Sequence, residues 1–140
     1  MRLTNVIYFA EYRLPHNLSF KSTFDDSVKA CKNIGMVLIM PYSKNESVDI
    51  LKFMKKNGLD NAWISKTANG PYGHKYADGS MVSYKGFWGK TWANGNPSVK
   101  DKVACAYIAP DGLWHDISGC DSTQSEQHVE YAICQITPGK

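Results

Sequence analysis

Four cysteines constrain the fold of this chain more than any other feature: Cys31, Cys105, Cys120 and Cys134. The segment between Cys105 and Cys120 has two short apolar runs on either side of the turn at 110–112, which reads Pro-Asp-Gly. Neighbouring strands lie about 5 Å apart, which a disulfide can bridge. The hairpin therefore favours Cys105–Cys120 and leaves Cys31 to pair with Cys134, although four cysteines allow three connectivities.

An even number of cysteines in a small chain is typical of secreted, oxidised proteins. Four free thiols and a zinc site are the alternatives, and the usual C-x2-C and H-x3-H spacings of zinc ligands do not occur. The apolar stretch in residues 1–10 is too short for a signal peptide, so we expect a secretion signal to have been removed. Sequons at Asn17 and Asn45 fit an extracellular glycoprotein.

The size and charge of the chain exclude several classes of protein. A chain of 140 residues, 43% of them hydrophobic, predicts one domain over 1–140 with a substantial core. The net charge is only +3 and the lysines are scattered, so neither nucleic acid nor an anionic membrane is an expected partner. No apolar run approaches the roughly 20 residues of a membrane span.

Two helices are predicted in the first half of the chain. Thr23 and Asp26 form a capping pair for the first helix, and Gly35 ends it. Ser43 and Glu46 form the corresponding pair for the second helix, which Gly58 ends. The expected inward faces are Phe24, Val28 and Cys31 in the first helix and Val48, Leu51 and Met54 in the second.

The rest of the chain predicts short strands around a long irregular region. Strands are expected at 6–9, 62–65, 103–108, 113–117 and 131–136, and residues 14–22 form a strand or a loop. Residues 67–98 hold Trp88, Trp92 and more than half of the glycines, which indicates a packed loop. Helices followed by a long loop and strands describe an α+β domain.

These features together resemble the C-type lectin-like domain, from about Ile7 to Gln135. Residues 62–65 (Ala-Trp-Ile-Ser) lie where that family has its Trp-Ile-Gly-Leu strand. Residues 92–98 match the Trp-x-x-Gly-Glu-Pro-Asn loop, and residues 112–116 match the Trp-Asn-Asp strand. The resemblance implies the short form of the domain, in which two helices pack on short antiparallel sheets. It also implies a long irregular loop and the disulfides Cys31–Cys134 and Cys105–Cys120.

Family members that bind sugars do so through a calcium ion in the long loop, and Ca²⁺ needs six to eight oxygen ligands. The positions that supply these ligands in the family are here Asn96, Ser98, Val103, His115 and Asp116. Only Asp116 keeps its carboxylate, and Asp101 is nearby. We therefore expect no cofactor. Asn96 and Asp116 are the candidate ligands if calcium binds.

No catalytic constellation is evident, so an enzyme is not expected. Bridged cysteines are not nucleophiles. The four histidines lie in different segments without an evident acid–serine partner: His16, His74, His115 and His128.

The predicted function is that of a secreted recognition module that binds a protein or a glycan through the long-loop surface, defined as residues 88–102 with His115 and Asp116. The alternative is a calcium-dependent lectin with an altered metal site.

Several residues of the long-loop surface also have a structural interpretation. The tryptophans would pack within the loop, His115 would pack on its strand, and Asp116 would anchor the loop to the strand. Lysines of this surface favour acidic partners such as sulfated glycans, and a dimer would be non-covalent. The candidate ligand-binding residues are Trp88, Lys90, Trp92, Asn94, Asn96, Ser98, Lys100, Lys102, His115 and Asp116.

Overall fold

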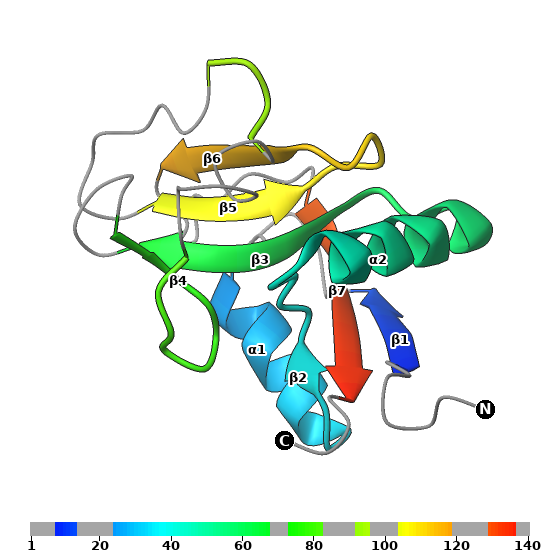
Figure 1. The fold of residues 1–140 in the computed structure, drawn as a ribbon. Coiled ribbons are helices and arrows are strands. Elements are labelled where there is room, and N and C mark those ends of the chain that lie inside the picture. The colour runs from blue at the N-terminus through cyan, green and yellow to red at the C-terminus, as the bar shows by residue number, and fades with distance from the viewer. Residues whose placement is uncertain are drawn as a thin grey trace, which may run out of the picture.

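The computed structural model describes residues 8–13, 24–67, 73–82, 92–95, 104–118 and 129–136. Two helices and a set of short strands make up this part of the chain (Figure 1), as predicted for an α+β domain. In chain order the elements are β1 (Tyr8–Arg13), α1 (Phe24–Asn33), β2 (Val37–Leu38), α2 (Lys44–Asn57), β3 (Asn61–Thr67), β4 (His74–Lys75), β5 (Ala104–Ile108), β6 (Trp114–Ser118) and β7 (Val129–Ile136). No helix among the described residues has the length and apolar character to cross a membrane.

The strands join in one sheet with the order β1-β7-β3-β5-β6, while β2 also pairs with β7 and β4 with β3. Among the labelled strands of the described ranges, the pairing of β3 with β7 is parallel and the other pairings are antiparallel. The first strand lies along the last one, from Tyr8 opposite Ile136 to Arg13 opposite Tyr131. The two ends of the domain are therefore held together by backbone pairing.

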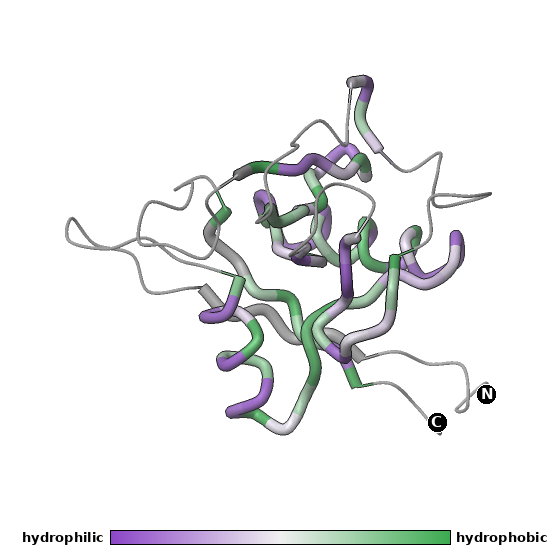
Figure 2. The backbone as a smooth tube through the Cα atoms, turned by 90° about the vertical axis from the view of Figure 1, so that its left-hand side faces the viewer, coloured by the Kyte–Doolittle hydropathy of each residue, from purple (hydrophilic) through white to green (hydrophobic). Residues whose placement is uncertain are grey.

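Helix α1 has the inward face that its sequence predicts. Phe24 and Cys31 are buried, and Val28 packs half-buried against the same cluster. The helix ends at Asn33, and Gly35 follows it with φ +75°, in the left-handed region that glycine adopts without strain. The predicted cap, Thr23, lies outside the described residues. Figure 2 shows hydrophilic and hydrophobic residues alternating along the helical turns.

Helix α2 begins and ends as predicted, but its buried face differs. The Ser43 side chain accepts a hydrogen bond from the Glu46 backbone N–H, and Gly58 ends the helix with φ +63°. The Glu46 carboxylate accepts from the backbone N–H of Tyr42 at 3.3 Å. Val48, predicted to face inward, is 41% exposed, and Ile50 is fully buried with Met54 instead. The prediction was wrong about Val48 because the apolar residues of this helix allow two overlapping stripes.

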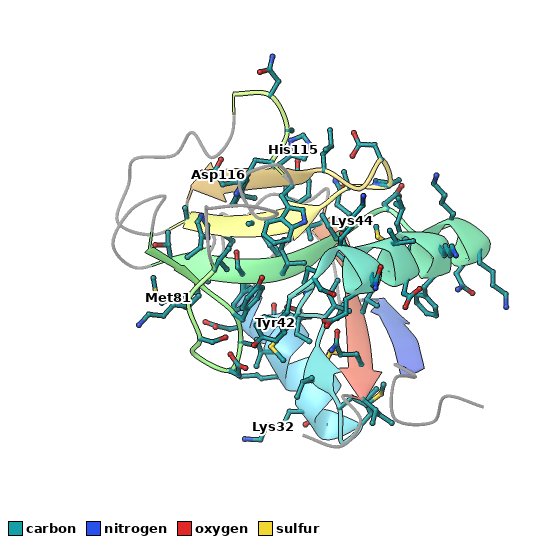
Figure 3. The ribbon with its side chains drawn as sticks, viewed as in Figure 1. Lys32, Tyr42, Lys44, Met81, His115 and Asp116 are labelled. Carbon is teal, nitrogen blue, oxygen red and sulfur yellow. A yellow bond between two sulfur atoms is a disulfide. The ribbon has the colours of Figure 1, made fainter. Side chains whose placement is uncertain are left out.

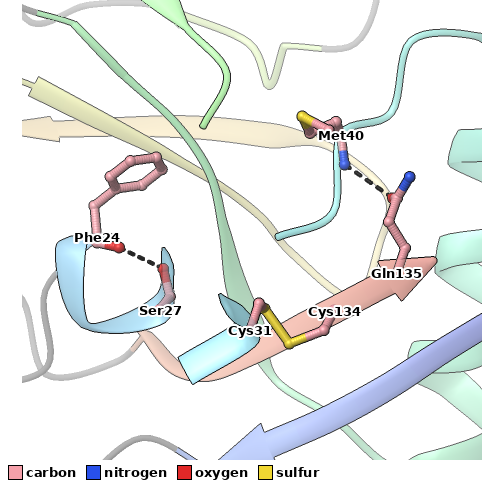
Figure 4. The surroundings of a disulfide bond; sticks show 6 residues. All are labelled: Phe24, Ser27, Cys31, Met40, Cys134 and Gln135. Carbon is pink, nitrogen blue, oxygen red and sulfur yellow. Dashed lines mark hydrogen bonds between the residues drawn. A yellow bond between two sulfur atoms is a disulfide. The ribbon is translucent and has the colours of Figure 1, made fainter. Parts of the chain in front are cut away.

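The disulfide Cys31–Cys134 joins α1 to β7 (Figure 4), as predicted. The two Cα atoms are 5.3 Å apart, and 103 positions separate the residues in the sequence. Cys105 is also disulfide-bonded. Its predicted partner, Cys120, lies outside the described residues, so the Cys105–Cys120 pairing stays a prediction.

The core divides into two clusters on opposite faces of the sheet. Ala62 and Ile64 of β3 belong to the cluster beneath α2, and Trp63 belongs to the cluster beside α1. A β-bulge interrupts this alternation, because the register with β5 shifts between Trp63 and Ser65. Ser65 is then paired with Ala106, a member of the first cluster, so its hydroxyl points into the core beneath α2.

Candidate functional site

Among the buried polar side chains that the structure describes, we consider three on the α2 face of the sheet together: Ser65, His74 and Asp116. We refer to them as the buried polar cluster. Ser65 and His74 are fully buried, and Asp116 is only 6% exposed. Buried polar groups are costly unless they find partners, so their presence together requires a structural explanation.

Strand pairing places Ser65 and Asp116 on either side of one residue of β5. Ala106 of β5 is paired with Ser65 on one side and with Asp116 on the other. Residues paired across strands share a face, so the small alanine separates the hydroxyl from the carboxylate on the same surface. His74 enters from β4, where it is paired with Thr67.

The imidazole of His74 has direct interactions with the other two groups. A hydrogen bond of 3.1 Å joins its Nδ1 to the Ser65 hydroxyl. Burial lowers the pKa of His74 from 6.5 to about 4, while the nearby Asp116 carboxylate acts in the opposite direction. The imidazole is therefore neutral at physiological pH.

Residues 92–95 lie beside this cluster and form a bridge to β6, where Trp92 is paired with Trp114. The Ala93 N–H donates to the Trp114 carbonyl at 2.8 Å, and the Trp92 and Trp114 rings meet edge-to-face at 5.5 Å. The Trp92 ring also lies 5.5 Å from the His74 ring. Trp92 is 8% exposed, so it packs in the core, in line with the structural interpretation of the loop tryptophans.

His115 and Asp116 are consecutive residues of β6 (Figure 3), so the alternation of side chains along a strand places them on opposite faces of the sheet. His115 stacks on Tyr107 with ring centroids 5.2 Å apart, and Tyr107 packs against the cluster beside α1. Asp116 and Trp114 face the α2 side. The two neighbouring residues that the sequence assigned to one binding surface are therefore separated by the sheet.

The remaining predicted site residues divide into one that is described and several that are not. Asn94 is exposed, in the turn before Gly95. Outside the described residues lie Trp88, Lys90, Asn96, Ser98, Lys100 and Lys102. The structure thus brings Trp92 and Asp116 to the same cluster through His74, a residue to which the sequence had assigned no site role.

Sequence reasoning missed Ser65 and His74. It found no acid–serine partner for any histidine, whereas His74 has Ser65 as a hydrogen-bond partner and Asp116 as an electrostatic one. One sequence signal was present: Ser65 is a polar residue directly after the apolar stretch at 62–64.

The buried polar cluster resembles a Ser-His-Asp triad in composition but not in geometry. In such a triad the serine contacts Nε2 of the histidine and the acid contacts Nδ1, whereas here the serine is on Nδ1. A nucleophilic serine must also meet its substrate, and Ser65 has no exposed surface. The arrangement suits a structural role, in which His74 connects β3, β6 and the 92–95 segment.

No group of three or more His, Cys, Asp and Glu side chains in the described ranges has an arrangement that could hold a metal ion. Asp116 has the neutral imidazole of His74 as a neighbour.

Solved structures of similar fold include several lectins. TC14, a C-type lectin of the tunicate Polyandrocarpa misakiensis, is 18% identical with a TM-score of 0.64, and the match covers 92% of this chain and 98% of that one. The carbohydrate-recognition domain of the mouse scavenger receptor C-type lectin is 23% identical with a TM-score of 0.61, covering 94% and 92%. SPL-1, in a complex with GlcNAc, is 16% identical with a TM-score of 0.63, covering 92% and 88%. At these identities the likeness concerns the fold alone.

The sequence itself matches a family model. No curated protein matches the chain at a significant level. The model of the lectin C-type domain matches residues 20–136, which include both helices and strands β2 to β7. With the disulfide from α1 to β7 and the fold shared with lectins of known structure, the chain belongs to the C-type lectin domain family.

Proposed function

We propose that this chain is a non-catalytic recognition module that acts outside the cell. It binds its ligand through the loop at 88–102, without the calcium-dependent sugar site of the family. The observation that carries this proposal is the burial of Asp116 against His74, because Asp116 is the single carboxylate retained at the positions that resemble the calcium ligands.

The surroundings of Asp116 do not suit calcium. Ca²⁺ prefers carboxylate, carbonyl and water oxygens, several of them at once. The Asp116 carboxylate interacts electrostatically with the buried imidazole of His74, and its strand neighbour His115 lies on the other face. The described part of the site therefore does not fit the ion, and recognition is expected to be independent of it.

The ligand is a protein or a glycan. Two structural neighbours are described as a carbohydrate-recognition domain and as a complex with GlcNAc, which supports a glycan. The lysines at 90, 100 and 102 favour an acidic partner, such as a sulfated glycan or an acidic protein surface. The disulfide Cys31–Cys134 fits an extracellular setting, and any dimer would be non-covalent.

A calcium titration tests this proposal directly. Isothermal calorimetry on the disulfide-bonded protein is expected to give no binding heat, and the melting temperature should be the same in calcium and in EDTA. Asp116→Asn, which keeps the size of the side chain, should behave in the same way.

The opposite result would support a calcium-dependent lectin with an altered metal site. That result is binding at sub-millimolar calcium which is lost in Asp116→Asn but kept in His115→Gln, a matched change on the opposite face of β6. Circular dichroism of both variants establishes that each is folded.

A further inference from the structure

The described part of the chain contains two asparagines that are each followed by glycine. Asn57–Gly58 lies at the end of α2, and Asn94–Gly95 lies in the turn of the 92–95 segment. An asparagine side chain loses its amide most easily in this sequence, because glycine has no Cβ to hinder the attack of its backbone nitrogen. On sequence alone the two pairs would react equally, so any difference between them comes from the fold.

Solvent access does not distinguish the two pairs. All four residues are exposed, and a Cβ built on either glycine would meet no atom within 4 Å. Figure 1 shows the 92–95 segment, in yellow-green, projecting beyond β6. Water can therefore reach the side-chain amide of both asparagines.

Hydrogen bonds hold the pair at the end of α2 in an unreactive arrangement. The Asn57 side-chain N–H donates to the Phe53 carbonyl at 2.9 Å, one turn back along the helix. The Gly58 N–H donates to the Lys55 carbonyl at 3.3 Å. For the Gly58 nitrogen to attack the Asn57 side-chain carbonyl, both hydrogen bonds must break and Asn57 must leave its helical conformation.

The pair in the 92–95 segment is not held in this way. The segment is attached to β6 just before the pair, where the Ala93 N–H donates to the Trp114 carbonyl at 2.8 Å. After that point the Gly95 N–H donates no hydrogen bond to any residue that the structure describes. Asn94 and Gly95 belong to a turn and not to a helix or strand. The Gly95 nitrogen can therefore attack without breaking a regular element.

We propose that Asn94 is a site of spontaneous covalent modification, at which the folded protein converts this asparagine into aspartate and isoaspartate. The Gly95 nitrogen forms a bond to Cγ of Asn94, the Cγ–Nδ2 bond breaks, and the amide proton of Gly95 leaves with the amino group as ammonia. Solvent water then opens the cyclic imide. Hydrolysis at Cγ gives aspartate, and hydrolysis at the main-chain carbonyl gives isoaspartate.

The modification changes the loop at 88–102 in two ways. It replaces a neutral amide with a carboxylate, which alters the charge of the loop. In the isoaspartate form the main chain runs through Cγ, which inserts a methylene group between residues 93 and 95. The change lies directly after the bridge that joins Trp92 to β6. Neither effect depends on the function proposed above.

Peptide mapping of the ageing protein tests this proposal. Trypsin places the two pairs in separate peptides, 57–66 and 91–100. The disulfide-bonded protein is incubated at neutral pH in water enriched in heavy oxygen and digested in ordinary water, so that only conversion during the incubation is labelled. We expect labelled aspartate and isoaspartate at Asn94, and at least about tenfold slower conversion of Asn57, where two hydrogen bonds must break first.

The unfolded chain is the control for the effect of sequence. In guanidinium chloride with a reductant, Asn57 and Asn94 should convert at similar rates, because the hydrogen bonds of α2 are lost. Asn94→Gln forms the corresponding ring far less readily, so it should remove the label from peptide 91–100 and leave peptide 57–66 unchanged. Two outcomes would overturn the proposal: no label at Asn94 in the folded protein, or equal rates for Asn57 and Asn94 in the folded protein.

Discussion

His74 is a histidine in a site from which water is excluded, and its protonation state affects the stability of the fold. Its pKa of about 4 lies below the ordinary value of 6.5, and burial is the main cause. Between these two pH values the unfolded chain binds a proton that the folded chain does not. The free energy of unfolding therefore decreases as the pH falls from 6.5 to about 4, and this contribution is constant outside that window.

The first prediction concerns this pH dependence. Since one pKa unit corresponds to about 1.4 kcal/mol, His74 should account for a loss of about 3 kcal/mol of stability across the window. In His74→Gln, urea unfolding measured at a series of pH values should show a flatter profile. Ser65→Ala is the control: it removes a hydrogen bond at a cost of about 1–3 kcal/mol but should keep the pH slope, because His74 stays buried. Equal slopes in wild type and His74→Gln would contradict the assignment.

At the scale of single elements, α2 shows which features depend on neighbouring residues and which depend on tertiary packing. Its caps depend on neighbouring residues, because the Ser43 side chain accepts a hydrogen bond from the Glu46 backbone N–H and Gly58 has a positive φ. Its buried face is not local, because the apolar residues between 48 and 54 allow more than one stripe. Packing on the sheet selects Ile50 and Met54, and Val48 remains exposed.

The second prediction tests this buried face. Ile50→Ala should lower the free energy of unfolding by about 2–5 kcal/mol, because it leaves a cavity in the core. Val48→Ala, a similar truncation on the exposed face, should change it by no more than about 0.5 kcal/mol. Both values come from urea unfolding at neutral pH. A Val48→Ala effect as large as that of Ile50→Ala would show that α2 packs as the sequence pattern first indicated.

At the scale of the whole molecule, two connections close the chain on itself. Strand β1 pairs with β7 over its length, and Cys31 in α1 is covalently bound to Cys134 in β7. Both connections join residues that are far apart in sequence, and the covalent one also restricts the unfolded chain.

The third prediction is the cost of losing that disulfide. For a loop of 103 residues the chain-entropy model gives a stabilisation of about 4–5 kcal/mol. The double variant Cys31→Ala/Cys134→Ala should lose about this amount in urea unfolding while keeping the far-ultraviolet circular dichroism spectrum of the folded protein. A loss below about 1 kcal/mol would mean that the unfolded chain is already restricted without the bridge.

Part of the candidate site could be read from the sequence. The alternation of side chains along a strand places His115 and Asp116 on opposite faces, and the sequence at 113–117 was already predicted to be a strand. Treating the two residues as one binding surface overlooked that alternation. The role of His74 could not be read in the same way, because its partners are Ser65 on another strand and Asp116 more than forty positions away.

The amino-acid sequence by itself determined the features that depend on neighbouring residues and on cysteine spacing. These are the two helices with their ends, the α+β class, the Cys31–Cys134 bridge and the membership of the C-type lectin domain family. Only the tertiary structure decided which face of α2 is buried and which polar groups gather around His74. These features depend on the bulge in β3 and on contacts between distant segments, whose energies no local pattern encodes.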